Sequence, residues 1–399
     1  MPRTVFALLV ALTPFLHSCA NEPASGGGAA DAANEASTVL DFQQIASVLL
    51  ARLDLQANER VLLVGLPGRF DALMPLLRSG IASAGAVDLG VWAVEGAAPD
   101  DWATDFTRSL IGQPQAALAE LLADVDAALM LPGPTPANTV YAAMQDVLRG
   151  NHGRTVHFHW LGAYKLDGTL KDIDEMVDDF YVRVLSDTDY DALGAAQRAF
   201  EAAMRGATVR VTTSAGTDLS FQIGDRPVTK QDGDASAARA RAGRNLIDRE
   251  VELPAGAIRV APVEQSVHGT IVFPPSVWGG ERTERLTLRF EQGVMVSLEA
   301  STGAEAALRE IEAAGDAGKA FREFALGFNP LLAIPGSGER WIPYYGYGAG
   351  VVRLSLGDNS ELGGTVGGGY VRWNFFTDTT VTVGDEVWVR DGRLVSSAP

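Results

Sequence analysis

The chain has 399 residues, of which 47% are hydrophobic and 21% are charged, and its formal net charge is -18. This length exceeds that of one ordinary domain, and the composition is typical of a globular protein rather than a disordered one. The excess of acidic residues argues against nucleic acid or an anionic membrane surface as the main partner.

Residues 1–18 resemble a bacterial lipoprotein signal. Arg3 supplies a positive start, and residues 5–16 form an apolar run that is too short to span a membrane as a mature helix. Cys19 follows a small residue, Ser18, and it is the only cysteine in the chain, so an internal disulfide is excluded. We expect Cys19 to be the lipidated first residue of the mature protein, with ordinary secretion as the alternative.

Residues 19–37 are rich in Gly, Ala, Ser and Asn, a composition that is typical of a flexible tether. The residue after Cys19 is Ala20 rather than aspartate, so retention at the inner membrane is not signalled. We therefore expect an exported protein of the bacterial cell envelope. Its lipid anchor would hold it at the outer membrane, facing the periplasm.

Residues 38–205 predict an α/β domain with an open parallel sheet. Apolar runs such as ERVLLVG, VDLGVWAV and TVHFHW predict strands, and they are separated by segments with helical spacing. Alternating strands and helices are typical of parallel sheets. The GLPGRF segment at residues 65–70 lacks the glycine spacing of a dinucleotide site and the Lys-Ser/Thr ending of a phosphate loop. It therefore indicates a tight turn rather than a nucleotide site.

Residues 206–399 predict a β-rich domain of the α+β type. Strand patterns with glycine turns dominate this half, and one long helix is predicted at residues 304–322. The two halves together predict the fold class α/β, with one domain of alternating strands and helices and one domain that is rich in strands.

Few side chains carry chemistry on their own evidence. His157 and His159 stand two apart on a predicted strand, so they share a face and are weak candidates for metal ligands. No third ligand is evident, and a structural role at the strand end is favoured. The acidic cluster of Asp187, Asp189 and Asp191 could bind calcium weakly, but capping of the next helix by Asp189 or its neighbour is favoured.

The second half carries a series of short motifs in a fixed order. They are GTDLSFQIGDR at residues 216–226, LPAGAIRVAPVEQSVHGTI at 253–271, FREFALGFNP at 321–330, VVRLSLGDNSELGG at 351–364, YVRWNFFTD at 370–378 and VWVRDGRLV at 387–395. In kind and in order they resemble the motifs of the aminopeptidase T family of two-metal aminopeptidases. The resemblance covers about residues 207–395. It implies that family's two-domain fold, removal of amino-terminal residues from peptides, and a homodimer.

The resemblance also implies five ligand positions for two divalent ions such as Zn²⁺, Co²⁺ or Mn²⁺. Such ions lower the pKa of a bound water and polarise the scissile carbonyl, and they need carboxylates and imidazoles as ligands. Only Glu323 keeps a ligand group among these five positions. The other four, in chain order, are occupied by Ala257, Arg353, Arg372 and Asn374.

An arginine at a ligand position opposes metal binding, because a guanidinium is not deprotonated in a protein and repels a cation. We therefore expect no functional two-metal centre and no cofactor, with Glu323 facing Arg353 and Arg372 in the former metal site. The cluster could be a closed, buried ion-pair network. It could also be an anion pocket in which Arg353, Arg372 and Asn374 bind a ligand. A replacement metal site would draw on neighbouring acids, namely Asp358, Glu361 and Asp378.

The sequence thus predicts an envelope-anchored, aminopeptidase-like protein that acts by binding a small anionic or peptide ligand, or a partner. The alternative is an active metal-dependent aminopeptidase that removes amino-terminal residues from peptides. A purely structural envelope protein is the third possibility.

Overall fold

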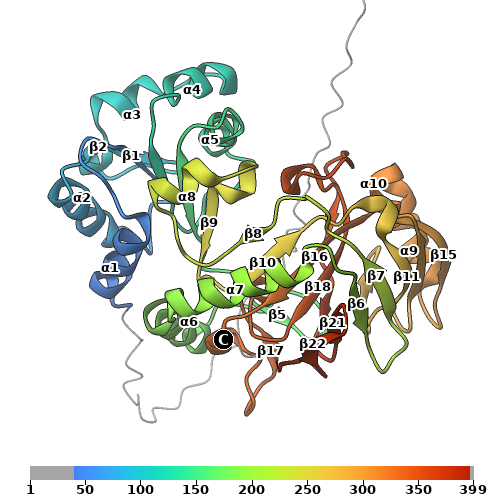
Figure 1. Ribbon diagram of the computed structural model, residues 1–399. Coiled ribbons are helices and arrows are strands. Elements are labelled where there is room, and N and C mark those ends of the chain that lie inside the picture. The colour runs from blue at the N-terminus through green and yellow to red at the C-terminus, as the bar shows by residue number, and fades with distance from the viewer. Residues whose placement is uncertain (1–39, 396–399) are drawn as a thin grey trace, which may run out of the picture. The chain divides into compact units, whose positions relative to one another are not determined.

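A five-stranded parallel sheet organises the first part of the chain in the computed structural model, which describes residues 40–395 (Figure 1). Its strands are β1 (Arg60–Gly65), β2 (Val87–Ala93), β3 (Ala127–Met130), β4 (Arg154–Phe158) and β9 (Glu250–Leu253). The strand order is β2-β1-β3-β4-β9, and every neighbouring pair is parallel. The central strands are continuous apolar runs because both faces of a parallel sheet are covered.

Helices cover both faces of this sheet. They are α1 (Phe42–Leu53), α2 (Leu73–Ser83), α3 (Asp105–Ser109), α4 (Gln115–Leu121), α5 (Thr139–Arg149) and α6 (Glu175–Asp187). The next helix, α7 (Tyr190–Met204), packs against the second part of the chain, where the Phe200 ring is centred 5.0 Å from that of Trp388. Alternate residues of β1 point to opposite faces. Val61 and Leu63 therefore belong to one apolar core with α1 and α2, whereas Leu62 and Val64 belong to a second core with α4 and α5.

The second part of the chain contains two antiparallel sheets. The six-stranded sheet has the order β19-β18-β16-β10-β8, and β20 also pairs with β18. Its strands are β8 (Thr229–Lys230), β10 (Ala257–Val260), β16 (Phe321–Gly327), β18 (Val352–Gly357), β19 (Val371–Arg372) and β20 (Phe375–Phe376).

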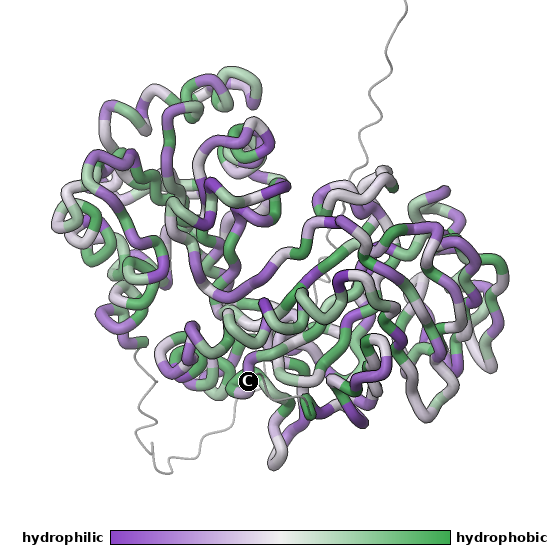
Figure 2. The backbone as a smooth tube through the Cα atoms, in the orientation of Figure 1, coloured by the Kyte–Doolittle hydropathy of each residue, from purple (hydrophilic) through white to green (hydrophobic). Residues whose placement is uncertain are grey.

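The eight-stranded sheet has the order β15-β14-β11-β7-β6-β21-β22-β23. Its strands are β6 (Val209–Thr212), β7 (Asp218–Phe221), β11 (His268–Val272), β14 (Thr287–Glu291), β15 (Val294–Glu299), β21 (Thr380–Val383), β22 (Glu386–Arg390) and β23 (Arg393–Leu394). Figure 2 shows polar and apolar residues interleaved along these strands, as expected for a sheet with one buried face. The two sheets pack through aromatic rings, with Phe221 of β7 centred 5.2 Å from Phe324 of β16.

Short elements complete the described chain. They are β5 (Tyr164–Lys165) paired with β17 (Trp341–Ile342), β12 (Ser276–Trp278) paired with β13 (Glu281–Thr283), and the helix α8 (Ala237–Ala242). Single 3₁₀ turns are η1 (Asp100–Trp102), η2 (Leu246–Asp248), η3 (Glu264–Ser266), η4 (Pro330–Leu332), η5 (Tyr344–Gly346) and η6 (Ser360–Leu362).

The α/β fold class and the β-rich second half are confirmed. Of two more local expectations, the long helix is wrong and the helix cap is confirmed. The expected helix at residues 304–322 is wrong as one element: it is α9 (Ala304–Ala313) followed by α10 (Gly315–Lys319), and Arg322 already lies in β16. Gly315 separates the two helices with a φ of 63°, which glycine adopts without strain. Capping by Asp189 is confirmed, since its side chain accepts a hydrogen bond from the Ala192 backbone N–H at 2.9 Å.

The expected boundary between residues 205 and 206 falls between α7 and β6, where the texture of the chain changes. One strand crosses that division, because β9 follows the boundary in sequence yet is an edge strand of the parallel sheet. The described residues belong to one compact unit. Within them, no helix is long and apolar enough to cross a bilayer. The predicted signal, Cys19 and the tether at residues 19–37 lie outside the described residues.

Candidate functional site

Three charged side chains meet on one face of the six-stranded sheet: Arg259 of β10, Glu323 of β16 and Arg353 of β18. The strand register brings them together, because Arg259 and Arg353 both stand opposite Ala325 of β16, one on each side. Glu323 lies two residues before Ala325 and so shares its face. The small Ala325 side chain leaves room for both guanidiniums to reach Glu323.

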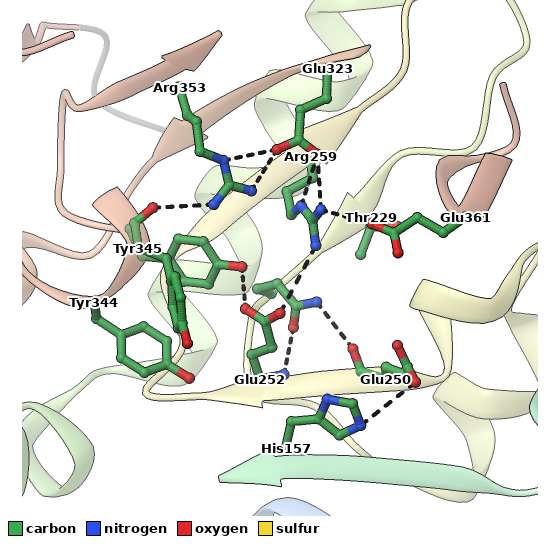
Figure 3. A network of polar contacts seen from close by, with 12 residues as sticks. His157, Thr229, Glu250, Glu252, Arg259, Glu323, Tyr344, Tyr345, Arg353 and Glu361 are labelled. Carbon is green, nitrogen blue, oxygen red and sulfur yellow. Dashed lines mark hydrogen bonds and ion pairs between the residues drawn. The ribbon is translucent and has the colours of Figure 1, made fainter. Parts of the chain in front are cut away.

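Glu323 is fully buried, and each of its carboxylate oxygens binds a different arginine (Figure 3). Arg353 Nε and Nη2 lie 2.8 and 2.7 Å from Oε1, whereas Arg259 Nη2 and Nε lie 2.9 and 3.2 Å from Oε2. Ser355 Oγ also lies 3.3 Å from Oε1. Burial by itself raises the pKa of Glu323, but the charges of Arg259 and Arg353 outweigh it and hold that pKa far below its usual range.

This cluster does not fit the metal pair that the family resemblance implies. Glu323 is the one retained ligand position, and its oxygens are taken by Arg353 and Arg259. Guanidinium groups offer donors only and keep their charge. Ala257 of β10 contributes no ligand atom. Among residues 40–395, no three His, Cys, Asp or Glu side chains are grouped so that they could hold a metal ion.

Arg372 does not face Glu323, so this part of the sequence expectation is wrong. Its Nη1 donates to Glu310 at 2.7 Å, and its guanidinium lies 3.5 Å from the centre of the Trp278 ring. The register explains the difference. Arg372 stands opposite Leu356 of β18, and Leu356 is three residues from Arg353. Residues an odd number apart on a strand point to opposite faces, and cross-strand partners share a face.

Asn374 stays with Arg372 rather than with the cluster. Its Oδ1 accepts from Arg372 Nε at 3.3 Å, and its Nδ2 donates to the Leu354 carbonyl at 3.1 Å. Both residues line a separate small pocket of about 60 Å³, whereas Arg353 lines a larger cavity. The three expected anion-binding residues, Arg353, Arg372 and Asn374, therefore do not form one site.

Arg259 and Arg353 form part of one wall of a cavity of about 260 Å³. The other wall comes from the parallel sheet, with His157 and His159 at the carboxyl end of β4 and Glu250 of β9. The carboxyl ends of parallel strands are where ligands commonly bind in open α/β sheets. Aromatic side chains complete the enclosure, namely Tyr141, Tyr345, Tyr347 and Trp373.

The wall formed by the parallel sheet carries a chain of polar groups centred on His157. The Tyr141 hydroxyl lies 2.6 Å from His157 Nδ1, and the Thr155 hydroxyl lies 3.1 Å from Nε2. Glu250 Oε1 lies 3.6 Å from the same Nε2 and accepts from Gln145 Nε2 at 2.9 Å. Burial lowers the pKa of His157 and raises the pKa of Glu250 to about 8. Burial thus favours the uncharged form of each group.

His159 lies beside His157, with the two rings centred 5.5 Å apart. Burial lowers the pKa of His159 as well. Both ring nitrogens of His157 already contact hydroxyl groups, so His157 has the hydrogen-bonded role that the strand position favoured.

Glu252 of β9 connects the two walls, and Glu361 is a second carboxylate beside Arg259. Glu252 accepts a hydrogen bond from the Tyr347 hydroxyl, and its Oε1 lies 3.9 Å from Arg259 Nη1. Glu361 Oε1 lies 3.2 Å from Arg259 Nη2 and also binds Arg322. Within the described part of the chain Arg259 Nη1 makes no hydrogen bond, and its ion-pair contact is with Glu252.

Tyr345 fixes the position of Arg353 at the cavity edge. Its backbone is left-handed, with φ 53° and ψ 21°, and its carbonyl accepts from Arg353 Nη1 at 3.3 Å. Its ring packs over Gly162, where a Cβ atom would lie 2.6 Å from the ring. The Arg353 guanidinium also lies 4.8 Å from the centre of the Trp373 ring. A non-glycine residue held in this backbone region is common at binding sites.

Sequence reasoning missed Arg259, although a signal was present. Arg259 is a charged residue in the LPAGAIRVAP motif, between Ile258 and Val260 on a strand that is buried throughout. A buried strand rarely carries a guanidinium without a partner. Glu250 was missed because its environment arises only when β9 pairs with β4.

Comparisons with known proteins agree with this architecture. The sequence model of the thermophilic metalloprotease family M29 matches residues 190–332. The solved structure titled 2,5-dihydroxypyridine dioxygenase from Pseudomonas putida KT2440 superposes with a TM-score of 0.57 at 17% identity, covering 90% of this chain and 98% of that one. Wild-type AmpT from Thermus thermophilus superposes with a TM-score of 0.56 at 15% identity, covering 89% and 99%. No curated protein matches the sequence.

The superposition on AmpT shows the fold class of this chain: it is a two-part α/β protein with the fold of AmpT. The M29 match over residues 190–332 agrees with the motifs that resemble the aminopeptidase T family, and that resemblance is confirmed. The same fold carries a protein whose title names a dioxygenase. The fold therefore does not decide the reaction, and the function has to be argued from the site.

Proposed function

We propose that this protein binds a small anionic or peptide ligand in its central cavity and does not work as a two-metal aminopeptidase. The observation that carries the proposal is the Arg259–Glu323–Arg353 cluster, in which two permanent cations surround the one retained ligand position. A divalent metal ion placed there would face repulsion from both guanidiniums, each roughly 8 kcal/mol at 4 Å for an effective dielectric of 20.

The cavity supports binding rather than simple filling of space. Arg259 and Arg353 both line it, and Arg259 Nη1 has no hydrogen bond within residues 40–395. At about 260 Å³ the cavity is smaller than typical drug-sized pockets of roughly 300–1,000 Å³, so the ligand is small. The anion-binding set is thus Arg259 with Arg353, in place of the set of Arg353, Arg372 and Asn374 that the sequence predicted.

Metal analysis and turnover test the first half of the proposal. Purified protein, folded by circular dichroism, is assayed for bound metal and for hydrolysis of amino-acid anilides with added Zn²⁺, Co²⁺ or Mn²⁺. We expect neither stoichiometric metal nor turnover. Stoichiometric metal with EDTA-sensitive turnover would overturn the proposal.

Ligand-induced stabilisation tests the second half. A panel of small carboxylates and short peptides is screened for a rise in melting temperature, which a ligand that binds only the folded state must produce. Arg259→Lys keeps the charge beside Glu323 but loses the fork, so it should weaken the response. Arg372→Ala is the matched control because Arg372 lies outside the cavity. A panel without any response would favour a purely structural protein.

A second candidate function is an active, metal-dependent aminopeptidase. It is favoured by the M29 match over residues 190–332 and by the retained Glu323. The metal and turnover measurements above separate the two candidates.

We also propose that the protein is exported, lipidated at Cys19 and anchored at the outer membrane, facing the periplasm. The support is the signal-like start of the chain and its single cysteine. Palmitate labelling of the wild type, absent from Cys19→Ser, is the expected result; equal labelling of both would contradict it. A homodimer is proposed from the family resemblance. Light scattering after size-exclusion chromatography should give the mass of a dimer, and the mass of a monomer would contradict the proposal.

A further inference from the structure

A second polar pocket, of about 170 Å³, lies at the end of the parallel sheet where its strands begin, away from the central cavity. It is formed where β1, β3, β4 and β9 begin, and α8 closes it from one side. Three arginines and two carboxylates line it: Arg154, Arg241, Arg249, Glu59 and Asp126. A local excess of positive charge is unusual in a chain whose net charge is -18.

Arg154 is a buried guanidinium whose donors are all used. Nη1 and Nη2 each lie 2.8 Å from an oxygen of Glu59, in a bidentate ion pair. Three backbone carbonyls take the remaining donors, at 2.7 Å from Nε, 3.3 Å from Nη1 and 3.1 Å from Nη2. This arrangement is what burial of an arginine normally requires.

Arg249 lines the same pocket and lacks such partners. Its exposed fraction is 7%, and its side chain makes one hydrogen bond, from Nη1 to the Gly153 carbonyl at 3.1 Å. Its Nε is buried without a hydrogen-bond partner. Within the described residues no carboxylate lies in ion-pair distance of Arg249. Burial accordingly lowers its pKa.

The nearby carboxylates are already engaged. Glu59 is bound by Arg154, and Asp126 Oδ2 accepts from the Arg60 backbone N–H at 2.8 Å. Asp248, next to Arg249 in sequence, accepts from the Thr229 hydroxyl at 3.0 Å and from a backbone N–H at 2.9 Å. A buried cation that the protein leaves unpaired costs several kcal/mol, and an anion from solution removes that cost.

We propose that this pocket binds a small oxyanion, either inorganic phosphate or the phosphate group of a monoester, with Arg249 as its main donor. Arg241 lines the pocket, is exposed, and forms no ion pair within the described chain, so it is free to close over the anion. A planar guanidinium fork matches two oxygens of a phosphate. The pocket volume accommodates a phosphate group but not a large ligand. The site is separate from the central cavity and does not depend on the function proposed for it.

Calorimetric titration and thermal melts of the full chain with sodium phosphate, at constant ionic strength set with sodium chloride, test the proposal. We expect one phosphate per chain and a rise in melting temperature that chloride does not produce. Arg249→Gln should bind phosphate about tenfold more weakly or worse, the loss expected for a charge-assisted hydrogen bond. Because its charge is unpaired, the same change should not lower the melting temperature in phosphate-free buffer.

Two further variants keep the test decisive. Arg244→Gln is the matched control, since Arg244 lies in the same segment but binds Asp225 outside this pocket. It should bind phosphate like the wild type. Arg241→Gln should weaken binding, and it serves if Arg249→Gln fails to fold. Glycerol 3-phosphate binding more tightly than phosphate would identify a monoester as the ligand.

The proposal is overturned if phosphate and chloride give the same melting curves, or if Arg249→Gln and Arg241→Gln bind phosphate as tightly as the wild type. It is also overturned if Arg244→Gln loses as much affinity as Arg249→Gln. An Arg259→Lys variant should leave phosphate binding unchanged, which separates this site from the central cavity.

Discussion

The two walls of the central cavity handle buried polar groups in opposite ways. On the six-stranded sheet, the Glu323 carboxylate is paired with Arg259 and Arg353, and Glu361 and Glu252 add negative charge beside Arg259. On the parallel sheet, His157 and Glu250 are buried with no Lys or Arg in ion-pair distance within the described residues, and burial moves the pKa of each toward its uncharged form.

This comparison shows how a metal site can be lost while the fold stays packed. In the wall that carries the former ligand positions, arginine side chains supply the positive charge that a metal ion would otherwise supply. A guanidinium keeps its charge at every accessible pH, so that wall does not titrate near neutrality. The opposite wall does titrate, and any pH dependence of the cavity near neutrality should originate there.

Glu323→Gln should have the largest effect on stability. Gln carries no charge, so two buried guanidiniums lose their partner, and such a change typically costs about 3–5 kcal/mol. The measurement is urea unfolding followed by circular dichroism. Asp218→Asn is the control, because its bidentate pair with Arg210 is exposed and such pairs contribute roughly 1 kcal/mol or less. Equal losses in the two variants would show that the cluster is not a buried charge network.

Glu250→Gln should change the pH dependence of stability. The folded pKa of Glu250 is about 8 against 4.5 for the unfolded chain, so stability from the protonated form is lost as pH rises between these values. Gln mimics the protonated carboxyl group. The variant should therefore gain on the wild type by roughly 3 kcal/mol in unfolding free energy between pH 5 and pH 8. A constant difference across this range would mean that Glu250 is ionised in the fold.

Tyr141→Phe should have a smaller effect that does not depend on salt. The change removes the hydroxyl at 2.6 Å from His157 Nδ1 and leaves a buried ring nitrogen unsatisfied. The expected loss is about 1–2 kcal/mol of unfolding free energy. Urea unfolding at low and high salt checks it, and a strong salt dependence would indicate a charged His157 instead.

Arg372→Ala should have the smallest effect. Arg372 occupies a former ligand position but belongs to neither wall, and its partner Glu310 is partly exposed. The expected loss is about 1 kcal/mol, from one ion pair and the contact with the Trp278 ring. Thermal melts with the best ligand from the panel complete the measurement. A lost ligand response would place Arg372 in the cavity after all.

Much of the fold could be predicted from local patterns. Apolar runs that alternate with segments of helical spacing predicted the parallel sheet. Asp189, which precedes an amphipathic segment, predicted a helix cap. The membership of β9 in that sheet could not be predicted, since strand pairing between residues about 95 apart leaves no local signal. The break between α9 and α10 depended on one glycine, Gly315, in an otherwise helical pattern.

The candidate site was predictable only where a motif fixed the residue and the strand fixed its face. Glu323 and Arg353 satisfied both conditions and are in contact. Arg372 satisfied the first alone, because its register against Leu356 turns the side chain to the other face. Arg259 was visible as a charged residue within an apolar strand, but its role needed the position of Ala325 between two arginines.

The sequence by itself determined the chemistry that is available: four of the five expected ligand positions hold residues that are poor metal ligands or none, and residue type alone decides that. Only the tertiary structure decided which charges are paired. Burial and strand register brought Arg259 and Arg353 to Glu323. Within the described residues they left Glu250 without a Lys or Arg partner and Arg249 without a carboxylate in ion-pair distance. Charge pairing depends on distances of a few ångströms between residues far apart in the chain, and composition and local pattern do not contain those distances.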